Sequence, residues 1–137
     1  MKTVVIFGAT GGIGAYTALY LCETGQYKII AVGHRESDNG FYSQYGIKYY
    51  SVDVSDYGSF AVLPKADIDV VINFAGVLPA RNYNPRLFIN SFTLGTLNVL
   101  EYMREVGCKK IITAQTPADL WYLQNTTAPM PADAPRS

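Results

Sequence analysis

Short apolar runs alternate along this chain with longer segments in which apolar residues recur at helical spacing. A continuous run of apolar and β-branched residues, without polar alternation, is typical of a strand that is buried on both faces of a sheet. Five such runs predict strands at residues 3–7, 28–32, 47–52, 69–74 and 110–114. The segments between them predict helices at residues 16–24, 55–63 and 85–106, followed by the stop signals Gly25, Pro64 and Gly107.

This alternation predicts the topology. Buried parallel strands joined by helices indicate an α/β fold, a Rossmann-type doubly wound parallel sheet, and right-handed crossovers give its five strands the order 3-2-1-4-5. We expect residues 1–123 to form this domain in incomplete form, and residues 124–137, which contain three prolines, to be a Pro-rich loop or disordered tail. Gly95 lies inside the longest predicted helix, where glycine costs about 1 kcal/mol relative to alanine, so we expect a close contact with another helix there.

Composition narrows the possible functions. The chain has 137 residues, 49% hydrophobic, with 11 basic and 11 acidic side chains, which fits one globular domain and excludes intrinsic disorder. A net charge of zero argues against nucleic-acid or membrane-surface partners, and no apolar run reaches the ~18 residues of a membrane span. Cys22 and Cys108 have neither disulfide-framework nor metal-ligand spacing, so we expect no metal site and reduced thiols in a cytoplasmic protein.

A glycine-rich turn, Gly8-Ala9-Thr10-Gly11-Gly12-Ile13-Gly14, joins the first predicted strand to the first predicted helix. Gly8 permits the tight turn out of the strand, Gly11 lets the backbone approach a pyrophosphate, and Gly14 lets the helix pack against the strand. Free N–H groups at the helix start then face the phosphates. The alternative is a tight turn without a ligand, but the strand–turn–helix context favours a dinucleotide.

The turn FGATGGIG resembles the T-G-A-T-G-x-I-G motif of the extended short-chain dehydrogenases, the NAD(P)-dependent sugar-nucleotide epimerases and dehydratases. Further segments resemble motifs of this family in the same order: Asp53-Val54, Asn73-Phe74-Ala75-Gly76, Gly95-Thr96-Leu97-Asn98-Val99-Leu100-Glu101 and residues 129–135. The resemblance implies cofactor contacts by Gly8, Thr10, Gly11, Gly12, Ile13 and Gly14. It also implies Asp53 and Val54 beside the adenine ring, and Asn73, Ala75 and Gly76 on the nicotinamide ribose side. Taken singly, Asp53 is equally a capping or turn residue, and Asn73 a turn former.

The end of the second predicted strand bears on the choice of cofactor. An NAD site has Asp or Glu there to accept from both ribose hydroxyls, whereas this chain has Gly33-His34-Arg35. A guanidinium is available for a 2′-phosphate, so we predict that NADP(H) is preferred and NAD(H) possible, with His34 and Arg35 at the site. In the alternative, Arg35 is a solvated surface charge and Glu36 or another group contacts the ribose. We interpret His34 as a loop residue rather than a catalyst.

The catalytic pair of the family, a Tyr with a Lys four positions later, is missing, because no tyrosine here has a lysine at that spacing. The resemblance implies that the chain ends before this pair, before the sixth strand and before the substrate domain. Pro117 stands at the family's catalytic hydroxyl position, which leaves Thr116 as a candidate if the loop shifts. Phe92 replaces an Asn that many relatives carry, and Asn90, about 200° around the helix from it, is expected to point away.

These observations support two main hypotheses. The first is the NAD(P)-binding domain of an epimerase, dehydratase or reductase that acts on a nucleotide sugar, inactive as this chain alone. The alternative is a non-catalytic dinucleotide-binding sensor or partner protein, which the departures at Phe92 and Pro117 favour; a ligand-free domain ranks third. We expect a dinucleotide as partner, a nucleotide sugar only with the C-terminal part present, and homo-oligomers through apolar surface that this part would otherwise cover.

Overall fold

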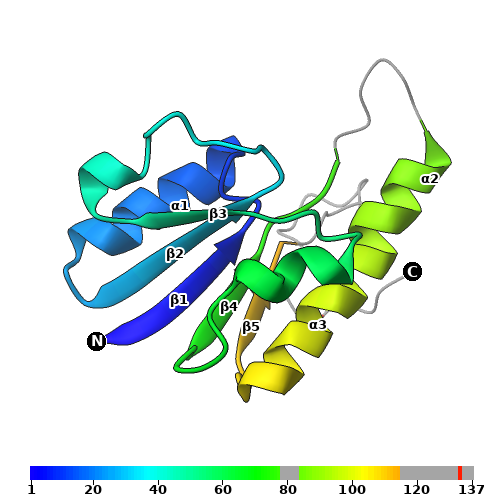
Figure 1. Ribbon diagram of the computed structural model, residues 1–137. Helices are drawn as coiled ribbons and strands as arrows, with labels where there is room; N and C mark the ends of the chain where they lie inside the picture. The colour runs from blue at the N-terminus through cyan, green and yellow to red at the C-terminus, as the bar shows by residue number, and fades with distance from the viewer. Residues whose placement is uncertain (78–83, 115–132, 134–137) are drawn as a thin grey trace.

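The computed structural model describes residues 1–77, 84–114 and 133, and a parallel five-stranded sheet forms its centre (Figure 1). The strands are β1 (Lys2–Phe7), β2 (Tyr27–Gly33), β3 (Lys48–Ser51), β4 (Val70–Asn73) and β5 (Ile111–Thr113). Their order, β3-β2-β1-β4-β5, confirms the predicted Rossmann-type topology. Phe7 pairs with Val32 on one side and with Asn73 on the other, so the carboxyl ends of the three central strands lie level.

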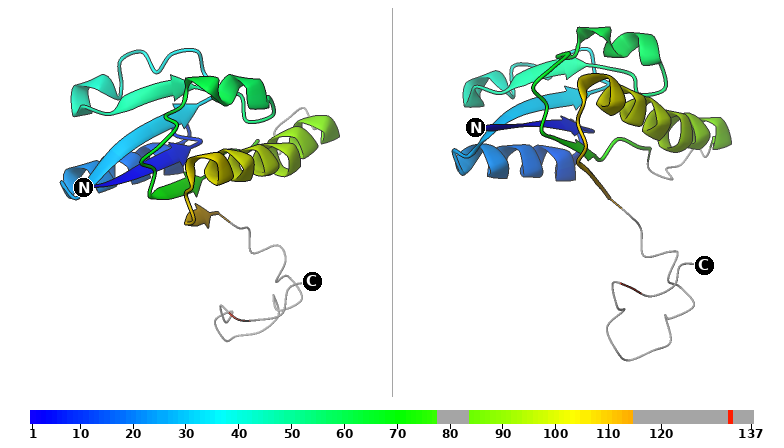
Figure 2. Two further views of the ribbon diagram at one scale, coloured as in Figure 1. Left: turned by 60° about the horizontal axis from the view of Figure 1, so that its bottom comes forward. Right: turned by 90° about the horizontal axis from the view of Figure 1, so that it is seen from below.

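Helices cover both faces of this sheet (Figure 2). On one face, α1 (Gly12–Glu23) buries Ala18 against a cluster that includes Ile6. On the other face lie η2 (Tyr57–Val62) and α3 (Gly95–Val106), which bury Phe60 and Val99 against a cluster that includes Phe7. Successive strand residues point to opposite faces, and because both faces are covered, the strands read as continuous apolar runs.

Two of the shorter helical predictions need correction. Residues 55–63 were expected to be helical, and the structure has the 3₁₀-helix η2 there, capped by the Asp56 carboxylate, which accepts from the Gly58 N–H at 3.0 Å. The tighter 3₁₀ form suits such a short connection. Helix α1 begins at Gly12 instead of residue 16, so the glycine turn passes directly into the helix. A further 3₁₀-helix, η1 (Ser43–Tyr45), precedes β3.

The long helix predicted at residues 85–106 consists of α2 (Pro85–Phe88), the π-helical η3 (Ile89–Leu94) and α3 in succession. The expected helix contact at Gly95 was wrong. A Cβ on Gly95 would lie 2.8 Å from Cγ2 of Val54, which belongs to the loop after β3. Glycine therefore brings the long helix close to this loop, at the edge where the strands end.

Within residues 1–77 and 84–114 no helix is long and apolar enough to cross a membrane, and no cluster of His, Cys, Asp and Glu side chains could hold a metal ion. Cys108 is buried, Cys22 is partly buried, and both are free thiols. The candidate Thr116, Pro117 and almost all of the predicted tail at 124–137 lie outside the described residues.

Candidate functional site

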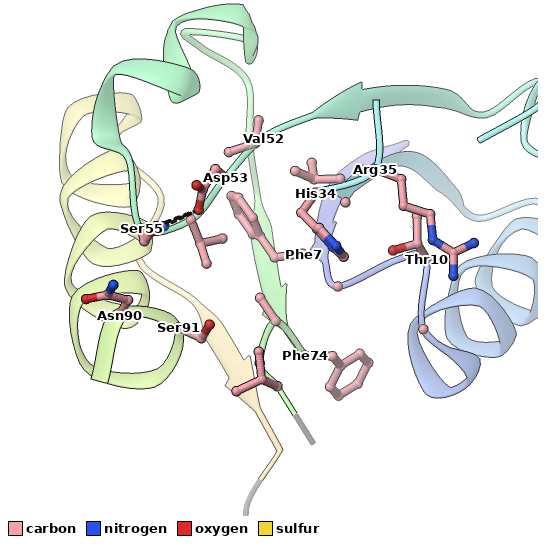
Figure 3. Close-up of a pocket in the computed structure, with 18 of the residues that line it drawn as sticks. Phe7, Thr10, His34, Arg35, Val52, Asp53, Ser55, Phe74, Asn90 and Ser91 are labelled. Carbon is pink, nitrogen blue, oxygen red and sulfur yellow. Dashed lines mark hydrogen bonds between the residues drawn. The ribbon is translucent and has the colours of Figure 1, made fainter. Parts of the chain in front are cut away.

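A cavity of about 620 Å³ opens at the carboxyl ends of the strands (Figure 3). It lies where the strand order reverses between β1 and β4, the position at which open α/β sheets bind ligands. The predicted cofactor residues that line it are Gly8, Thr10, Gly11, His34, Arg35, Asp53, Val54, Ala75 and Gly76. Those that do not are Gly12, Ile13, Gly14 and Asn73. The fold thus brings together residues from four separate loops.

The glycine turn is held by backbone contacts that leave no room for side chains. Gly8 has a φ of +76°, and a Cβ there would lie 2.6 Å from the carbonyl carbon of Phe74. A Cβ on Gly14 would collide with the Gly8 carbonyl oxygen and lie 2.9 Å from Cα of Ala9. No side chain caps α1, whose first-turn N–H groups have no partner within a helix and are available to an anion.

Arg35 stands at the corner where the chain leaves β2. In Figure 3 its guanidinium lies beside Thr10, near the start of α1. Gly33 lets this corner close, because a Cβ on it would lie 2.6 Å from Thr10 Cγ2 and 2.8 Å from the Tyr49 hydroxyl. That hydroxyl donates to the Arg35 carbonyl at 2.6 Å. The corner therefore combines a free cationic side chain with a backbone that is hydrogen-bonded to β3.

Two tyrosines behind this corner remain protonated at neutral pH. Burial, together with the nearby Asp38 carboxylate and Tyr49, raises the pKa of Tyr42 to about 12. Burial and Asp38 also raise the pKa of Tyr49, against a smaller lowering by Arg35. Both hydroxyls are consequently hydrogen-bond donors over the physiological range, and that of Tyr42 donates to the Ala9 carbonyl in the glycine turn.

Asp53 and Asn73 each hold a turn at the edge of the cavity. The Asp53 carboxylate accepts from the Ser55 N–H at 2.9 Å and from the Ser55 hydroxyl at 2.7 Å, so it acts as a turn residue while also lining the cavity. Asn73 is buried, and its side-chain oxygen accepts from the Ala75 N–H at 3.1 Å. Asn73 therefore orients the backbone of Ala75, which does line the cavity.

Sequence reasoning missed the part of the lining that comes from the long helix. Leu87, Asn90 and Ser91 line the cavity, although Asn90 was expected to point away. That expectation assumed 100° per residue, whereas the π turn of η3 holds more residues per turn and changes the direction of each side chain. No sequence signal marks this π turn. Phe92, one residue further, covers Gly76, whose added Cβ would lie 2.7 Å from Phe92 Cζ.

The described lining of the cavity offers groups that bind anions and hydroxyls. Its charged side chains among the described residues are Arg35 and Asp53, and that part of its lining contains neither a tyrosine nor a lysine. Backbone N–H groups, a guanidinium and hydroxyls of Thr10, Ser55 and Ser91 surround it. Such groups bind phosphates and ribose hydroxyls, so the lining of the cavity fits a dinucleotide.

Comparison with known proteins assigns the family. Residues 4–134 match the NAD dependent epimerase/dehydratase family, and the chain belongs to it. It is 27% identical over 123 residues to a UDP-glucose 4-epimerase of Lacticaseibacillus casei, covering 85% of this chain and 36% of that protein. It is 30% identical over 122 residues to an inverting UDP-N-acetylglucosamine 4,6-dehydratase of Campylobacter jejuni, with 84% and 36% covered. The chain thus spans about a third of the length of these relatives.

Solved structures show the same fold. A crystal structure of a UDP-galactose 4-epimerase superposes with a TM-score of 0.78 at 25% identity, over 99% of this chain and 45% of that one. The fold is also that of an Agrobacterium tumefaciens uronate dehydrogenase complexed with NAD, with a TM-score of 0.70 at 17% identity over 87% of this chain and 42% of that one. The family description implies a nicotinamide dinucleotide as the cofactor.

Proposed function

We propose that this chain is a dinucleotide-binding domain that prefers NADP(H) to NAD(H) and belongs to an enzyme acting on a nucleotide sugar. The glycine turn carries the proposal. Its backbone packs directly on the ends of β1 and β4, and it leads into a helix without a side-chain cap beside the cavity. The cavity volume of about 620 Å³ lies in the range of small-molecule and cofactor sites.

The preference for NADP(H) is supported by the corner after β2. Gly33 offers no carboxylate to the ribose hydroxyls, and Glu36, the alternative ribose partner, lines neither this cavity nor the pocket beside it. That second pocket, of about 330 Å³, is bordered by Arg35, Ser37 and Gly12. A 2′-phosphate there would meet a guanidinium, a hydroxyl and the start of a helix. NAD(H), which lacks this phosphate, would be the weaker ligand.

One acidic side chain, Asp38, also borders the second pocket. Its two carboxylate oxygens accept from the backbone N–H groups of Gly40 and Tyr42, at 3.2 and 2.8 Å. These bonds offset part of its charge, because a carboxylate that accepts backbone N–H bonds presents fewer free lone pairs to a ligand. Asp38 therefore shapes the loop and weakens the phosphate site less than a free carboxylate would.

The nucleotide sugar and the reaction are inferred from the relatives. The UDP-sugar epimerases and the dehydratase named above are two to three times longer than this chain, so we propose that substrate contacts and the Tyr-x-x-x-Lys pair are supplied outside it. Thr116 remains the candidate hydroxyl within the chain. By itself the chain is then expected to bind cofactor without turnover.

Exposed apolar side chains support self-association. They lie along the long helix and include Leu87, Ile89, Leu94, Leu97 and Leu100. Exposed apolar side chains that gather on one helix favour homo-oligomers when no other element covers them. The free thiols of Cys22 and Cys108 support a reducing compartment, the cytoplasm.

A second function, a non-catalytic dinucleotide sensor or partner protein, is favoured by Phe92. Its ring lies over Gly76, at a position where the family resemblance implies an Asn, and the described lining contains neither a tyrosine nor a lysine. Measurement of epimerase and dehydratase activity on UDP-glucose with the complete natural protein, whatever its length, separates the two functions. Turnover supports the enzyme, and cofactor binding without turnover supports the sensor.

Titration of the purified chain with NADPH and NADH, followed by calorimetry, tests the cofactor proposal. We expect saturable binding with NADPH the tighter ligand. Arg35→Ala should raise the Kd for NADPH about 10- to 100-fold, which is the range for lost hydrogen bonds to a charged group. The Kd for NADH should stay within about twofold of that of the unmodified chain. Lys28→Ala removes the same charge at the opposite end of β2 and is the matched control.

Gly11→Val tests the turn itself. A Cβ on Gly11 would meet only the Gly8 carbonyl oxygen, at 3.5 Å, so the fold should persist while the pyrophosphate is kept away. Binding of both dinucleotides should be lost. Tighter binding of NADH by the unmodified chain would overturn the NADP(H) preference, and failure of the folded chain to bind either would overturn the dinucleotide site.

A further inference from the structure

Tyr42 and Tyr49 form a stacked pair beneath the loop that carries Arg35. Their ring centroids are 6.2 Å apart and their planes are nearly parallel, at 4°. Tyr42 is 1% exposed, and Tyr49 is partly buried. Neither side chain lines the main cavity, and although Tyr42 borders the second pocket, the proposed function assigns no role to either of them. Both nevertheless donate hydrogen bonds to backbone carbonyls at the edge of the site.

The register of the sheet explains how Tyr49 reaches Arg35. In the parallel pairing of β2 and β3, Tyr49 lies opposite Ala31, and Ser51 lies opposite Gly33. The hydroxyl of Tyr49 donates a hydrogen bond to the carbonyl of Arg35 at 2.6 Å, although Arg35 lies four residues beyond Ala31 in the chain. Tyr49 passes Gly33 so closely that a Cβ there would lie 2.8 Å from the hydroxyl oxygen. This hydroxyl is thus placed where the chain turns out of β2.

The far end of the same loop is held by Tyr42. Its backbone N–H donates to the Asp38 carboxylate at 2.8 Å, and its hydroxyl donates to the Ala9 carbonyl in the glycine turn. The loop of residues 34–42 is therefore attached at both ends, by Tyr49 beside Arg35 and by Tyr42 beside the glycine turn. Only the attachment by Tyr49 acts directly on the residue that carries the guanidinium.

We propose that Tyr49 is a positioning residue for cofactor selection, whose hydroxyl holds the Arg35 backbone so that the guanidinium faces the 2′-phosphate of NADP(H). This inference rests on the proposed function. A long cationic side chain on a mobile backbone loses conformational entropy when it binds a phosphate, and a fixed backbone removes part of that loss before binding. NADH has no 2′-phosphate, so its affinity gains nothing from the same hydrogen bond.

The test compares Kd values for NADPH and NADH in four proteins: the unmodified chain, Tyr49→Phe, Arg35→Ala and the double variant. Tyr49→Phe removes one hydroxyl and keeps the ring. Loss of a single hydrogen bond typically changes an equilibrium constant about 2- to 12-fold, so we expect the Kd for NADPH to rise about fivefold. NADH should change less than about twofold. In the Arg35→Ala background, Tyr49→Phe should have no further effect on NADPH, because the two residues act through one contact.

Tyr50→Phe is the matched control, since Tyr50 is the next residue of β3 and packs on the other face of the sheet. Its two Kd values should equal those of the unmodified chain. Equal weakening of NADPH and NADH by Tyr49→Phe, or an undiminished effect in the Arg35→Ala background, would overturn the inference, because Tyr49 would then support only the fold. If Arg35→Ala itself leaves the Kd for NADPH unchanged, the proposed preference for NADP(H) is wrong, and this inference, which rests on it, is wrong as well.

Discussion

Two of the regions that surround the cavity are built by different means. The glycine-turn wall (residues 8–14) is packed backbone against backbone, as the contacts of Gly8 with Phe74 and of Gly14 with Gly8 show. The helix wall (residues 74–77 and 87–92) is closed by a side chain, the ring of Phe92 over Gly76, and that side chain is 48% exposed. The first wall cannot move without moving strands, whereas the second can adjust by a rotamer change. A fixed wall suits the constant part of a ligand, and an adjustable wall suits the part that differs between reactions.

Gly14→Ala should show the rigidity of the glycine-turn wall most clearly, through its effect on the free energy of unfolding. The new Cβ would meet the Gly8 carbonyl oxygen and the Ala9 Cα, both backbone atoms that no rotamer change can displace. We expect a loss of about 3 kcal/mol or more in the free energy of unfolding, because overpacking that shifts backbone is among the costly substitutions. Urea denaturation followed by circular dichroism measures it.

Gly12→Ala is the control for this variant, since a Cβ on Gly12 has nothing within 4 Å. Its stability should stay within about 0.5 kcal/mol of the unmodified chain, as for surface substitutions in general. Similar stabilities of Gly14→Ala and Gly12→Ala would mean that the glycine-turn wall is as adaptable as the helix wall.

The glycine-turn wall could be predicted from the sequence, and most of the fold with it. The glycines 8, 11 and 14 stand at a strand–helix junction, where local spacing and backbone geometry determine the outcome. The strand order followed in the same way, from continuous apolar runs and the handedness of crossovers. These features depend on short-range patterns, which a single sequence contains.

The helix wall could not be predicted in the same detail. The π turn that directs Asn90 and Ser91 to the cavity leaves no trace in an apolar periodicity, because it changes the angle per residue over one turn only. The partner of Gly95 turned out to be Val54, and the hydroxyl of Tyr49 reaches Arg35. These contacts join segments far apart in the chain, so they depend on tertiary packing that no local spacing specifies.

Tyr42→Phe should have an intermediate effect on the glycine-turn wall. Loss of the hydroxyl leaves the Ala9 carbonyl without this donor, so we expect the chain to be about 1–2 kcal/mol less stable at neutral pH. The folded state raises the pKa of Tyr42 from 10.0 to about 12, which means that the unfolded chain loses this proton first. The contribution of Tyr42 is therefore fully present below pH 10 and is lost as the pH rises from 10 to 12.

Urea denaturation at a series of pH values measures this contribution. The stability of the unmodified chain should fall between pH 10 and pH 12, and the decline should be shallower in Tyr42→Phe. Tyr16→Phe is the control, because Tyr16 is 81% exposed on α1 and should leave the pH profile unchanged. If stability fell equally steeply with pH in Tyr42→Phe and in the unmodified chain, the loss between pH 10 and pH 12 would not be due to Tyr42.

Gly76→Ala should have the smallest effect, although its Cβ, 2.7 Å from Phe92 Cζ, would collide with the ring much as a Cβ on Gly14 would collide with backbone. The difference is that the obstructing atom is the far end of a half-exposed ring, which can turn away at a cost of less than about 1 kcal/mol. In a Phe92→Ala background the obstruction is gone, so Gly76→Ala should then cost nothing measurable. Urea denaturation of the two single variants and the double variant isolates this coupling. A loss above about 2 kcal/mol that Phe92→Ala does not relieve would mean that backbone, not the ring, closes the helix wall, and the two walls would then be equally rigid.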